Sequence, residues 1–166
     1  MSKLIIIFIM LVVSGCGYKP SAKYARNVLG NKINTSVVIS SIDPENTVVI
    51  KDAVDIALVE IFHTSLTDIK HADTHLNISL SRPIYTPIQY NSDGFVVAYR
   101  ATIVLYITRE SKNLKKKYIS KGTYDFSVLP NAVFTDQERF DAIKFGSAKA
   151  ISSFIAQVSA EGSRSK

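Results

Sequence analysis

Alternating apolar and polar residues predict three consecutive strands in the middle of this chain. They span residues 76–84, 95–109 and 118–128, and the link at 91–94 reads Asn-Ser-Asp-Gly, a sequence typical of a tight reversal. Short links of this kind join antiparallel neighbours. One face of the longest strand is apolar and contains Phe95, Val97, Tyr99, Ala101, Ile103, Leu105 and Ile107. Its other face is more polar, so one side of the sheet is expected to belong to the core.

A further strand is predicted before these three. Residues 33–42 are rich in β-branched side chains and stop at Asp43-Pro44, a pair that favours a turn. Pro83 and Pro87 fall in the next apolar stretch that alternates. Because proline has no amide hydrogen to donate to a neighbouring strand, we expect that strand at an edge of the sheet or bulged at Pro83.

Apolar spacings of three and four predict two helices. Residues 50–66 place apolar side chains on one face and polar side chains on the other. The apolar face contains Ile50, Val54, Leu58, Ile61, Phe62 and Leu66. A longer helix is expected after Thr135, because the Thr135-x-x-Glu138 spacing can satisfy the first amides of a helix. Its buried stripe contains Phe140, Ile143, Ser147, Ala150, Ile151, Phe154, Ile155 and Val158.

The predicted order is strand, helix, three strands, helix. A strand-helix-strand start requires a crossover, which makes its two strands parallel, whereas the later links make antiparallel pairs. We therefore predict an α+β, two-layer sandwich in which two helices pack on one face of a four-stranded mixed sheet. This single domain is expected to span residues 33–160, with a polar tail at 161–166. The other face of the sheet stays open to solvent or to a partner.

The first 15 residues have the pattern of an export signal. Lys3 precedes ten uninterrupted apolar residues at 4–13, and the small residues Ser14 and Gly15 follow. As a helix, that run would cover about 15 Å, roughly half of the ~30 Å hydrocarbon core of a bilayer. A permanent membrane span is therefore disfavoured. Removal of residues 1–15 leaves 151 residues, enough for one core.

The segment Val13-Ser14-Gly15-Cys16 resembles the lipobox of bacterial lipoproteins. That resemblance implies cleavage before Cys16, a diacylglyceryl group on its thiol and, from Gly17 at the next position, sorting to the outer membrane. Two or more acyl chains are what stable anchoring requires. Residues 16–32 would then form a lipidated tether that leads to the domain. The alternative is a plain secretory signal followed by a chance cysteine.

The chain carries a surplus of positive charge. The formal net charge is +6, or +5 without Lys3, which favours acidic surfaces such as lipid phosphates, nucleic acid or an acidic protein. The densest cluster lies at the predicted hairpin tip and contains Lys112, Lys115, Lys116 and Lys117. Arg100 and Arg109, on the longest strand, add charge to the same hairpin. These cations are candidate ligands for anionic phosphates. The alternative is a solvated loop that keeps a sheet edge soluble.

The sequence contains no motif typical of catalysis. A glycine-rich phosphate loop and a spaced nucleophile and base are both missing, so an enzyme is not expected. His71 and His75, with His63 upstream, have the composition of a metal site, but a polar connection would not hold them on one face. We expect surface histidines there and predict no metal or cofactor. Cys16 is the only cysteine, which excludes an internal disulfide and a cysteine-based zinc site.

The order of elements and three local motifs resemble the lipopolysaccharide-assembly lipoprotein LptE family, from Cys16 to about Ala160. The motifs are Cys-Gly-Tyr at 16–18, Ala-Tyr-Arg at 98–100 within the strand from Gly94 to Ile107, and Tyr-Asp-Phe at 124–126 leading to Asn131 and the final helix. The resemblance implies an outer-membrane lipoprotein that acts as plug and assembly partner of the LptD β-barrel. Such a protein helps lipopolysaccharide reach the cell surface without catalysis and without nucleic acid.

The candidate lysines and Arg100 are a physical hypothesis and are not carried over from that family. The main alternative function is a periplasmic lipoprotein subunit of another envelope or secretion complex, which binds its partner through the open face of the sheet. An enzyme is the third alternative.

Overall fold

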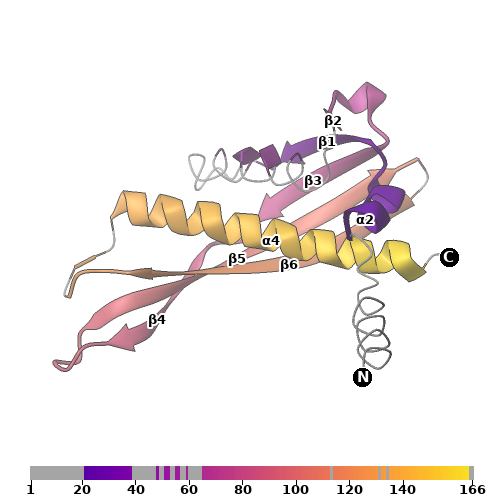
Figure 1. Ribbon diagram of the computed structural model, residues 1–166. Helices are drawn as coiled ribbons and strands as arrows, with labels where there is room; N and C mark the ends of the chain where they lie inside the picture. The colour runs from indigo at the N-terminus through magenta and orange to yellow at the C-terminus, as the bar shows by residue number, and fades with distance from the viewer. Residues whose placement is uncertain are drawn as a thin grey trace, which may run out of the picture.

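The computed structural model describes residues 21–38, 48, 51, 52, 55, 56, 59, 65–112, 114–130, 132, 133 and 135–164. Its helices are α2 (Ser21–Leu29), the short 3-10 helix η1 (Ile69–His71) and α4 (Asp136–Arg164). Its strands are β1 (Lys32–Val37), β2 (Ser65–Leu66), β3 (Thr74–Leu80), β4 (Ile84–Tyr90), β5 (Val96–Ser111) and β6 (Leu114–Ser127). The body is elongated, and α4 runs along it (Figure 1). None of the described helices is both long enough and apolar enough to span a bilayer.

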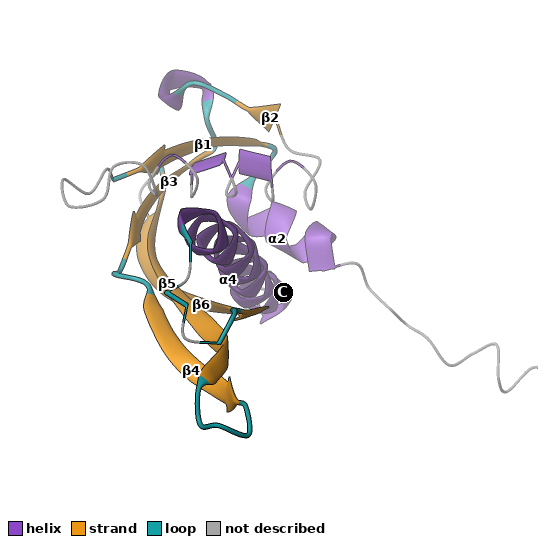
Figure 2. Ribbon diagram, turned by 90° about the vertical axis from the view of Figure 1, so that its left-hand side faces the viewer, coloured by secondary structure: helices purple, strands orange, loops and turns teal. Residues whose placement is uncertain are grey.

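The strands form a six-stranded mixed sheet. β1 pairs in parallel with β2 on one side and with β3 on the other, and β3 pairs antiparallel with β5. β6 pairs with β5 from Ala98 to Ser111, whereas β3 pairs with residues 105–110 and β4 with residues 96–102. Strand β6 occupies one edge of β5. The other edge of β5 is shared by β3 and β4, which therefore lie end to end. The sheet curls, and α4 lies on its concave side (Figure 2).

The core lies between the concave face of the sheet and α4. Alternate residues of β5 from Ala101 to Ile107 are buried there. The buried residues of α4 are Ala142, Ile143, Gly146, Ser147, Ala150, Ile151, Phe154, Ile155, Val158, Ser159 and Gly162. α2 joins the same core through Ala25 and Leu29, both fully buried. One apolar cluster therefore holds the two helices and the sheet together.

The predicted fold class is confirmed, because helices cover one face of a mixed sheet and leave the other face open. The crossover at the start is confirmed by the parallel pairing of β1 with β3. The alternation predicted for the longest strand is confirmed from Ala101 to Ile107. The predicted helix start is also confirmed: Glu138 Oε2 accepts a hydrogen bond from the Thr135 amide at 2.6 Å, and the Glu138 amide donates to Thr135 Oγ1 at 3.2 Å.

The sheet has more strands than the four predicted. The stretch expected as one strand at 76–84 ends at Leu80, and β4 begins at Ile84, because Pro83 between them cannot donate to a neighbouring strand. The edge position expected for the strand at 76–84 is wrong for β3, which lies between β1 and β5, whereas β4, which contains Pro87, lies at an edge next to β5. Leu66, predicted as the last apolar residue of a helix, lies in β2 instead.

The prediction of a tether at residues 16–32 is wrong for residues 21–29, which form α2. The helix forms because Ala25 and Leu29 are four residues apart and face α4 together. Gly30, at φ +80°, ends it, and the Gly30 amide donates to the Arg26 carbonyl at 2.8 Å. The polar tail predicted at 161–166 is also wrong as far as Arg164, because α4 continues through those residues.

Several predictions fall on residues outside the described ones. These are the export signal at 1–15, Cys16, the end of the first predicted strand and most of the apolar stripe predicted for residues 50–66. Within that predicted helix, residues 51, 52, 55, 56 and 59 are helical. Thr35 Oγ1 donates to Asp55 Oδ1 at 2.7 Å, which links this segment to β1.

Candidate functional site

Three of the four candidate lysines, Lys115, Lys116 and Lys117, lie on β6 and not in a loop. β5 continues to Ser111 and β6 begins at Leu114, so the reversal is confined to the region of Lys112, whose φ is +42°. The residues at 115–117 therefore occupy successive strand positions, and their side chains alternate between the two faces of the sheet. The loop predicted at 110–117 is corrected accordingly. The strand separates the lysines into two environments, one beneath α4 and one on the open face.

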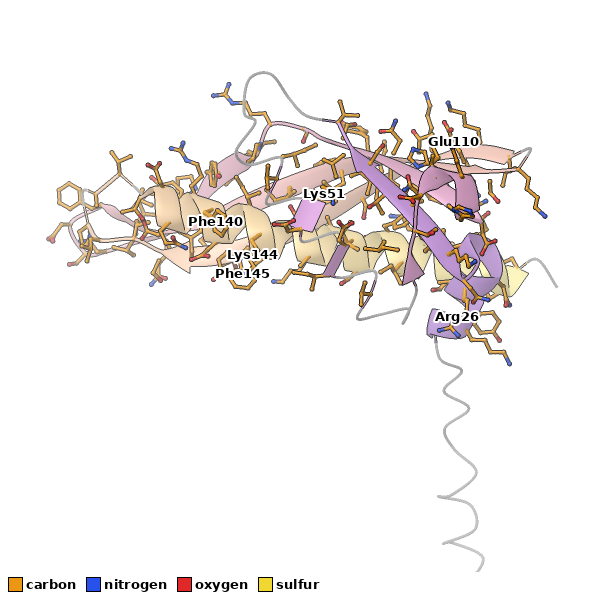
Figure 3. All side chains as sticks on the ribbon, turned by 90° about the horizontal axis from the view of Figure 1, so that it is seen from above. Arg26, Lys51, Glu110, Phe140, Lys144 and Phe145 are labelled. Carbon is orange, nitrogen blue, oxygen red and sulfur yellow. The ribbon has the colours of Figure 1, made fainter. Side chains whose placement is uncertain are left out.

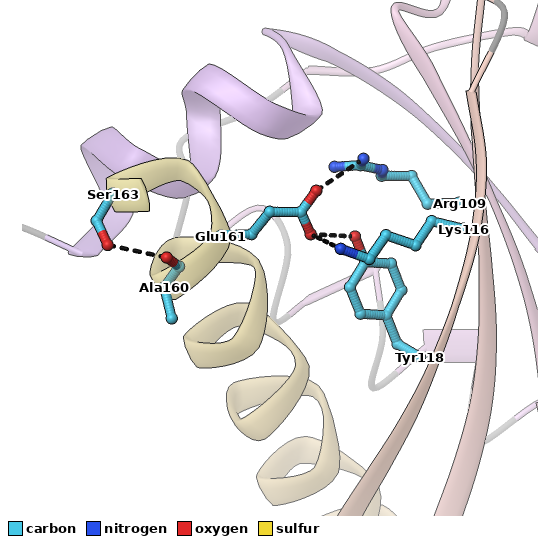
Figure 4. Close-up of polar contacts among 6 residues, drawn as sticks. All are labelled: Arg109, Lys116, Tyr118, Ala160, Glu161 and Ser163. Atoms are coloured by element: carbon cyan, nitrogen blue, oxygen red, sulfur yellow. Dashed lines mark hydrogen bonds and ion pairs between the residues drawn. The ribbon is translucent and has the colours of Figure 1, made fainter. Parts of the chain in front are cut away.

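Lys116 belongs to a polar cluster beneath the end of α4 (Figure 4). We call it the Glu161 cluster, because Glu161 contacts its other three members, Arg109, Lys116 and Tyr118. Glu161 Oε2 accepts hydrogen bonds from Tyr118 Oη at 2.7 Å and Lys116 Nζ at 2.8 Å. Arg109 Nη2 donates to Glu161 Oε1 at 3.1 Å. The cluster therefore ties α4 to both β5 and β6.

Burial and hydrogen bonding set the charges of this cluster. Burial alone would raise the pKa of Glu161, but the hydrogen bonds from Lys116 and Tyr118 and the charge of Arg109 hold it below its ordinary value of 4.5. Burial and the hydrogen bond to Glu161 raise the pKa of Tyr118 to about 12. At neutral pH the carboxylate is thus ionised and the phenol keeps its proton.

Arg109 lies inside the fold, although the sequence suggested a surface charge on the hairpin. Its relative exposure is 2%, and its Nε and Nη1 atoms have no hydrogen-bond partner among the described residues. It faces α4 because it continues the alternation of Ile103, Leu105 and Ile107. Its guanidinium carbon lies 5.8 Å from the ring centroid of Tyr118. Arg109 is therefore bound to Glu161 of α4 and is not available to a ligand at the surface.

A groove of about 600 Å³ opens beside the Glu161 cluster, between β6 and the last turns of α4. Three exposed cations line it, Lys116 and Lys117 from the strand and Arg164 from the helix, together with the carboxylate of Glu161. Gln157 Nε2 donates to the Ile119 carbonyl at 3.0 Å on the groove wall. The groove thus combines three cations, one of them paired with the Glu161 carboxylate, so Lys117 and Arg164 are its candidate contacts for a ligand that carries phosphate.

A second hollow, of about 480 Å³, lies at the end of the β5–β6 hairpin. Lys112 and Lys115 line it, together with Ile69 of η1 and Leu114 of β6. Lys115 Nζ lies 2.6 Å from Glu110 Oε1, and this contact lowers the pKa of the Glu110 carboxyl from its ordinary value. The hollow combines two lysines and two carboxylates, those of Asp73 and Glu110, with exposed aliphatic side chains.

Arg100 is not part of either hollow. Its Nε and Nη2 atoms lie 2.7 Å from the two carboxylate oxygens of Asp125, in a fork-like pair across β5 and β6. Eleven residues of strand separate it from Ser111, which at about 3.3 Å per residue is roughly 35 Å. The structure therefore does not bring Arg100 together with the four candidate lysines.

His75 has structural partners on the open face of the sheet. His75 Nδ1 lies 2.7 Å from Asn34 Oδ1, and His75 Nε2 lies 3.4 Å from Ser36 Oγ, so the ring joins β3 to β1. His71 is exposed in η1, and His63 lies outside the described residues. In the described part of the chain, no three His, Cys, Asp or Glu side chains come together as metal ligands.

Two carboxylates important to this end of the molecule were missed by sequence reasoning. Glu161 was assigned to a polar tail, although it is flanked by Ala160 and Gly162, small residues that permit close helix packing. Asp73 was assigned to a polar connection. Its Oδ2 accepts from the amides of Asn31 and Lys32, each at 3.0 Å, and these bonds lower its pKa. No local sequence pattern around Asp73 pointed to this role.

Comparisons with known proteins identify solved structures that share the fold of this chain, but no family to which it belongs. No family model matches the chain, and no curated protein sequence matches it. A candidate lipoprotein from Caulobacter crescentus CB15 matches with a TM-score of 0.53 at 8% identity, covering 86% of this chain and 98% of that one. A minor lipoprotein from Acinetobacter baumannii matches with a TM-score of 0.51 at 9% identity, covering 81% and 94%.

A third solved structure has the same fold. It is a protein from Xanthomonas campestris described by the family DUF330, with a TM-score of 0.50 at 11% identity, covering 82% of this chain and 88% of that one. At identities this low, the likeness establishes the shared architecture alone. The chain therefore has a fold found in bacterial lipoproteins.

Proposed function

We propose that this chain is a lipid-anchored lipoprotein of the bacterial outer membrane, a plug and assembly partner of the LptD β-barrel that binds lipopolysaccharide without catalysis. The observation that carries the proposal is an elongated body (Figure 1) that begins a few residues after Cys16, the proposed anchor residue. Cys16 lies five residues before Ser21, where α2 begins, so the link reaches at most ~18 Å. Since α2 is packed into the core, motion of the anchor is coupled to the body.

The dimensions of the body support a role as a plug. α4 has 29 residues, which at about 1.5 Å per residue gives a length of about 43 Å. This length exceeds the ~30 Å hydrocarbon core of a bilayer, so a body of this length can occupy a barrel from one rim to the other. α4 and the strands beside it run along the same long axis (Figure 1).

The open face of the sheet supports contact with a barrel wall. Tyr106 and Ile119 pair across β5 and β6 on this face and are 48% and 64% exposed. Thr102, Thr108 and Thr123 lie on the same face. The inner wall of a large barrel is polar, and a face that mixes hydroxyl groups with isolated apolar side chains suits it.

The groove between β6 and α4 supports binding of lipopolysaccharide. Lys117 and Arg164 place two cations at its rim, where they can meet the phosphates of lipid A. Ala160 gives the groove apolar surface for the first part of an acyl chain, whereas Ile119 contributes its backbone to the groove wall and its side chain lies on the open face. Nothing in this arrangement requires a bond to be made or broken.

Depletion of the protein in its host tests the proposal. We expect lipopolysaccharide to be lost from the cell surface and LptD to be misassembled, with both defects rescued by the wild-type chain and not by Cys16→Ser. In mild detergent, the protein should copurify with the barrel. Normal surface lipopolysaccharide and a normal barrel after depletion would contradict the proposal. Copurification with inner-membrane or pilus components would instead favour a subunit of another envelope complex.

A further inference from the structure

The charges of the described residues are separated along the body. We call one end the anchor end, formed by residues 21–33, 65–75, 109–118 and 161–164. It holds ten cations and four anions, whereas the remaining described residues hold seven of each. The cations are Lys23, Arg26, Lys32, Lys70, Arg109, Lys112, Lys115, Lys116, Lys117 and Arg164. Arg26 and Glu110 lie toward this end, whereas Phe140, Lys144 and Phe145 lie in the other half of α4 (Figure 3).

The anchor end is held together as one unit. The backbone amides of Asn31 and Lys32 donate to Asp73 Oδ2, and Ser111 Oγ donates to the Asp73 carbonyl at 3.0 Å. These bonds join the turn after α2, the segment before β3 and the end of β5. Gly30 packs against Asp73 so tightly that a methyl group there would lie 2.5 Å from the Asp73 Cβ. The positive surface therefore moves with α2, and α2 follows Cys16 in sequence by a few residues.

Exposed aliphatic side chains lie among these cations. Ile69 and Leu114 are 62% and 51% exposed, and both line the hollow that also contains Lys112, Lys115 and the carboxylates of Asp73 and Glu110. Lys70 is the neighbour of Ile69 in η1. Lysine beside exposed aliphatic residues is typical of a surface that meets the headgroup region of a bilayer, where ammonium groups contact phosphate and apolar side chains leave water.

We propose that this surface, made of Ile69, Lys70, Lys112, Leu114 and Lys115, docks on anionic phospholipid headgroups of the leaflet that holds the lipid anchor. The proposal rests on acylation of Cys16 in the function proposed above. The contact orients the body with its long axis away from the leaflet, because the positive charge lies at one end of α4. The lysines of this surface thus serve the membrane, and the groove with Lys117 and Arg164 remains for lipopolysaccharide.

A labelling experiment on the mature, acylated protein tests the docking. His71→Cys places a thiol for a fluorescent dye in η1, and Ser92→Cys places one at the opposite end as a control; both residues are exposed. The proteins are reconstituted into vesicles of phosphatidylcholine, with or without phosphatidylglycerol, that contain a lipid with a quencher on its headgroup. We expect phosphatidylglycerol to increase quenching at residue 71 and to leave quenching at residue 92 unchanged.

Charge substitutions make the test specific. Replacement of Lys112 and Lys115 by Ser should weaken docking about fivefold for each charge removed, and added salt should weaken it further. Lys144→Ser with Lys149→Ser removes the same charge from the other half of the body and should change nothing. Equal quenching at residue 71 with and without phosphatidylglycerol, or an equal loss in the control variant, would overturn the docking surface.

The same preparations separate this proposal from the anchor on which it rests. Because Cys16 is the only native cysteine, an acylated protein takes one dye per chain and an unacylated one takes two. Two dyes would overturn the lipid anchor. In that case, flotation of the unacylated chain with phosphatidylglycerol vesicles, lost with Lys112→Ser and Lys115→Ser, would still support the surface, and failure to float would reject it.

Discussion

Gly122 of β6 lies directly against Gly146 of α4, so closely that a methyl group on Gly122 would overlap the Gly146 carbonyl oxygen. Gly146 in turn lies on Ile103, whose Cγ1 would be 2.5 Å from a methyl group at position 146. Two residues along β6, Ser120 Oγ donates to the Ala150 carbonyl. These contacts set the distance between the helix and the sheet at the middle of the body.

Replacement of Gly122 by Ala should therefore destabilise the fold. The added methyl group meets backbone atoms of α4, which cannot move aside as a flexible side chain can, and overpacking of this kind costs about 1–3 kcal/mol. Thr123→Ala is the matched control, because residue 123 is adjacent in β6 and faces the open side; it should stay within about 0.5 kcal/mol of wild type. Denaturant unfolding measures both. Equal midpoints for the two variants would show that α4 does not contact β6 at Gly122.

Because the guanidinium of Arg109 is buried, substitutions at Arg109 and at Glu161 should lower the free energy of unfolding by different amounts. Glu161→Gln leaves the charge of Arg109 inside the protein without a carboxylate and should cost about 3 kcal/mol. Arg109→Met removes the charge and keeps much of the volume, so we expect a cost of about 1 kcal/mol or less. The double variant should be more stable than Glu161→Gln alone. The reverse order of the single variants, measured by denaturant unfolding, would contradict the burial of Arg109.

Protonation of Glu161 should also lower the free energy of unfolding at acidic pH. Its pKa in the folded protein lies below its ordinary value of 4.5, so the unfolded chain binds a proton more readily. Its contribution is therefore complete above about pH 4.5 and is lost as the pH falls through its folded pKa. Glu161→Gln should flatten the acid side of a plot of unfolding free energy against pH. An unchanged acid slope in the variant would show that the carboxylate is not held ionised by its neighbours.

Ionisation of Tyr118 should lower the free energy of unfolding at alkaline pH. Its folded pKa is about 12, above the ordinary value of 10, so its contribution to stability is complete below pH 10 and declines as the pH rises toward 12. Ultraviolet titration of the folded protein should show a tyrosine that ionises later than the exposed ones, and Tyr118→Phe should remove that late step. A late step that survives in Tyr118→Phe would assign it to another tyrosine.

Much of the arrangement of the sheet and helix layers could be predicted from the sequence. Period-two alternation identified the buried face of β5, since Ile103, Leu105 and Ile107 all lie beneath α4. The Thr135-x-x-Glu138 spacing located the start of α4 to within one residue. Both signals are local and depend on a long, regular element.

The polar contacts were not accessible from the same patterns. Arg109 occupies an apolar position of the alternation, but its charge was taken as a sign of exposure, because a buried arginine depends on a carboxylate 52 residues away. Lys115 and Lys117 were assigned to a loop because charge runs usually lie in loops, whereas pairing with β5 extends β6 through them. α2 was missed because a nine-residue helix depends on tertiary packing for its stability.

Of the three consecutive lysines, Lys116 has a structural role and Lys115 and Lys117 are surface residues. This difference determines which substitutions can test lipopolysaccharide binding. Lys116→Ser removes a partner of Glu161 and should lower stability, so a triple substitution at 115–117 would confuse folding with binding. Lys117→Ser with Arg164→Ser removes the two groove cations that lie outside the Glu161 cluster and should weaken binding of purified lipopolysaccharide about tenfold or more, with little change in the unfolding midpoint. Arg100→Ser, at the distant pair with Asp125, is the control and should leave binding unchanged. Equal affinity of all three proteins at low salt would remove the groove as the lipopolysaccharide site.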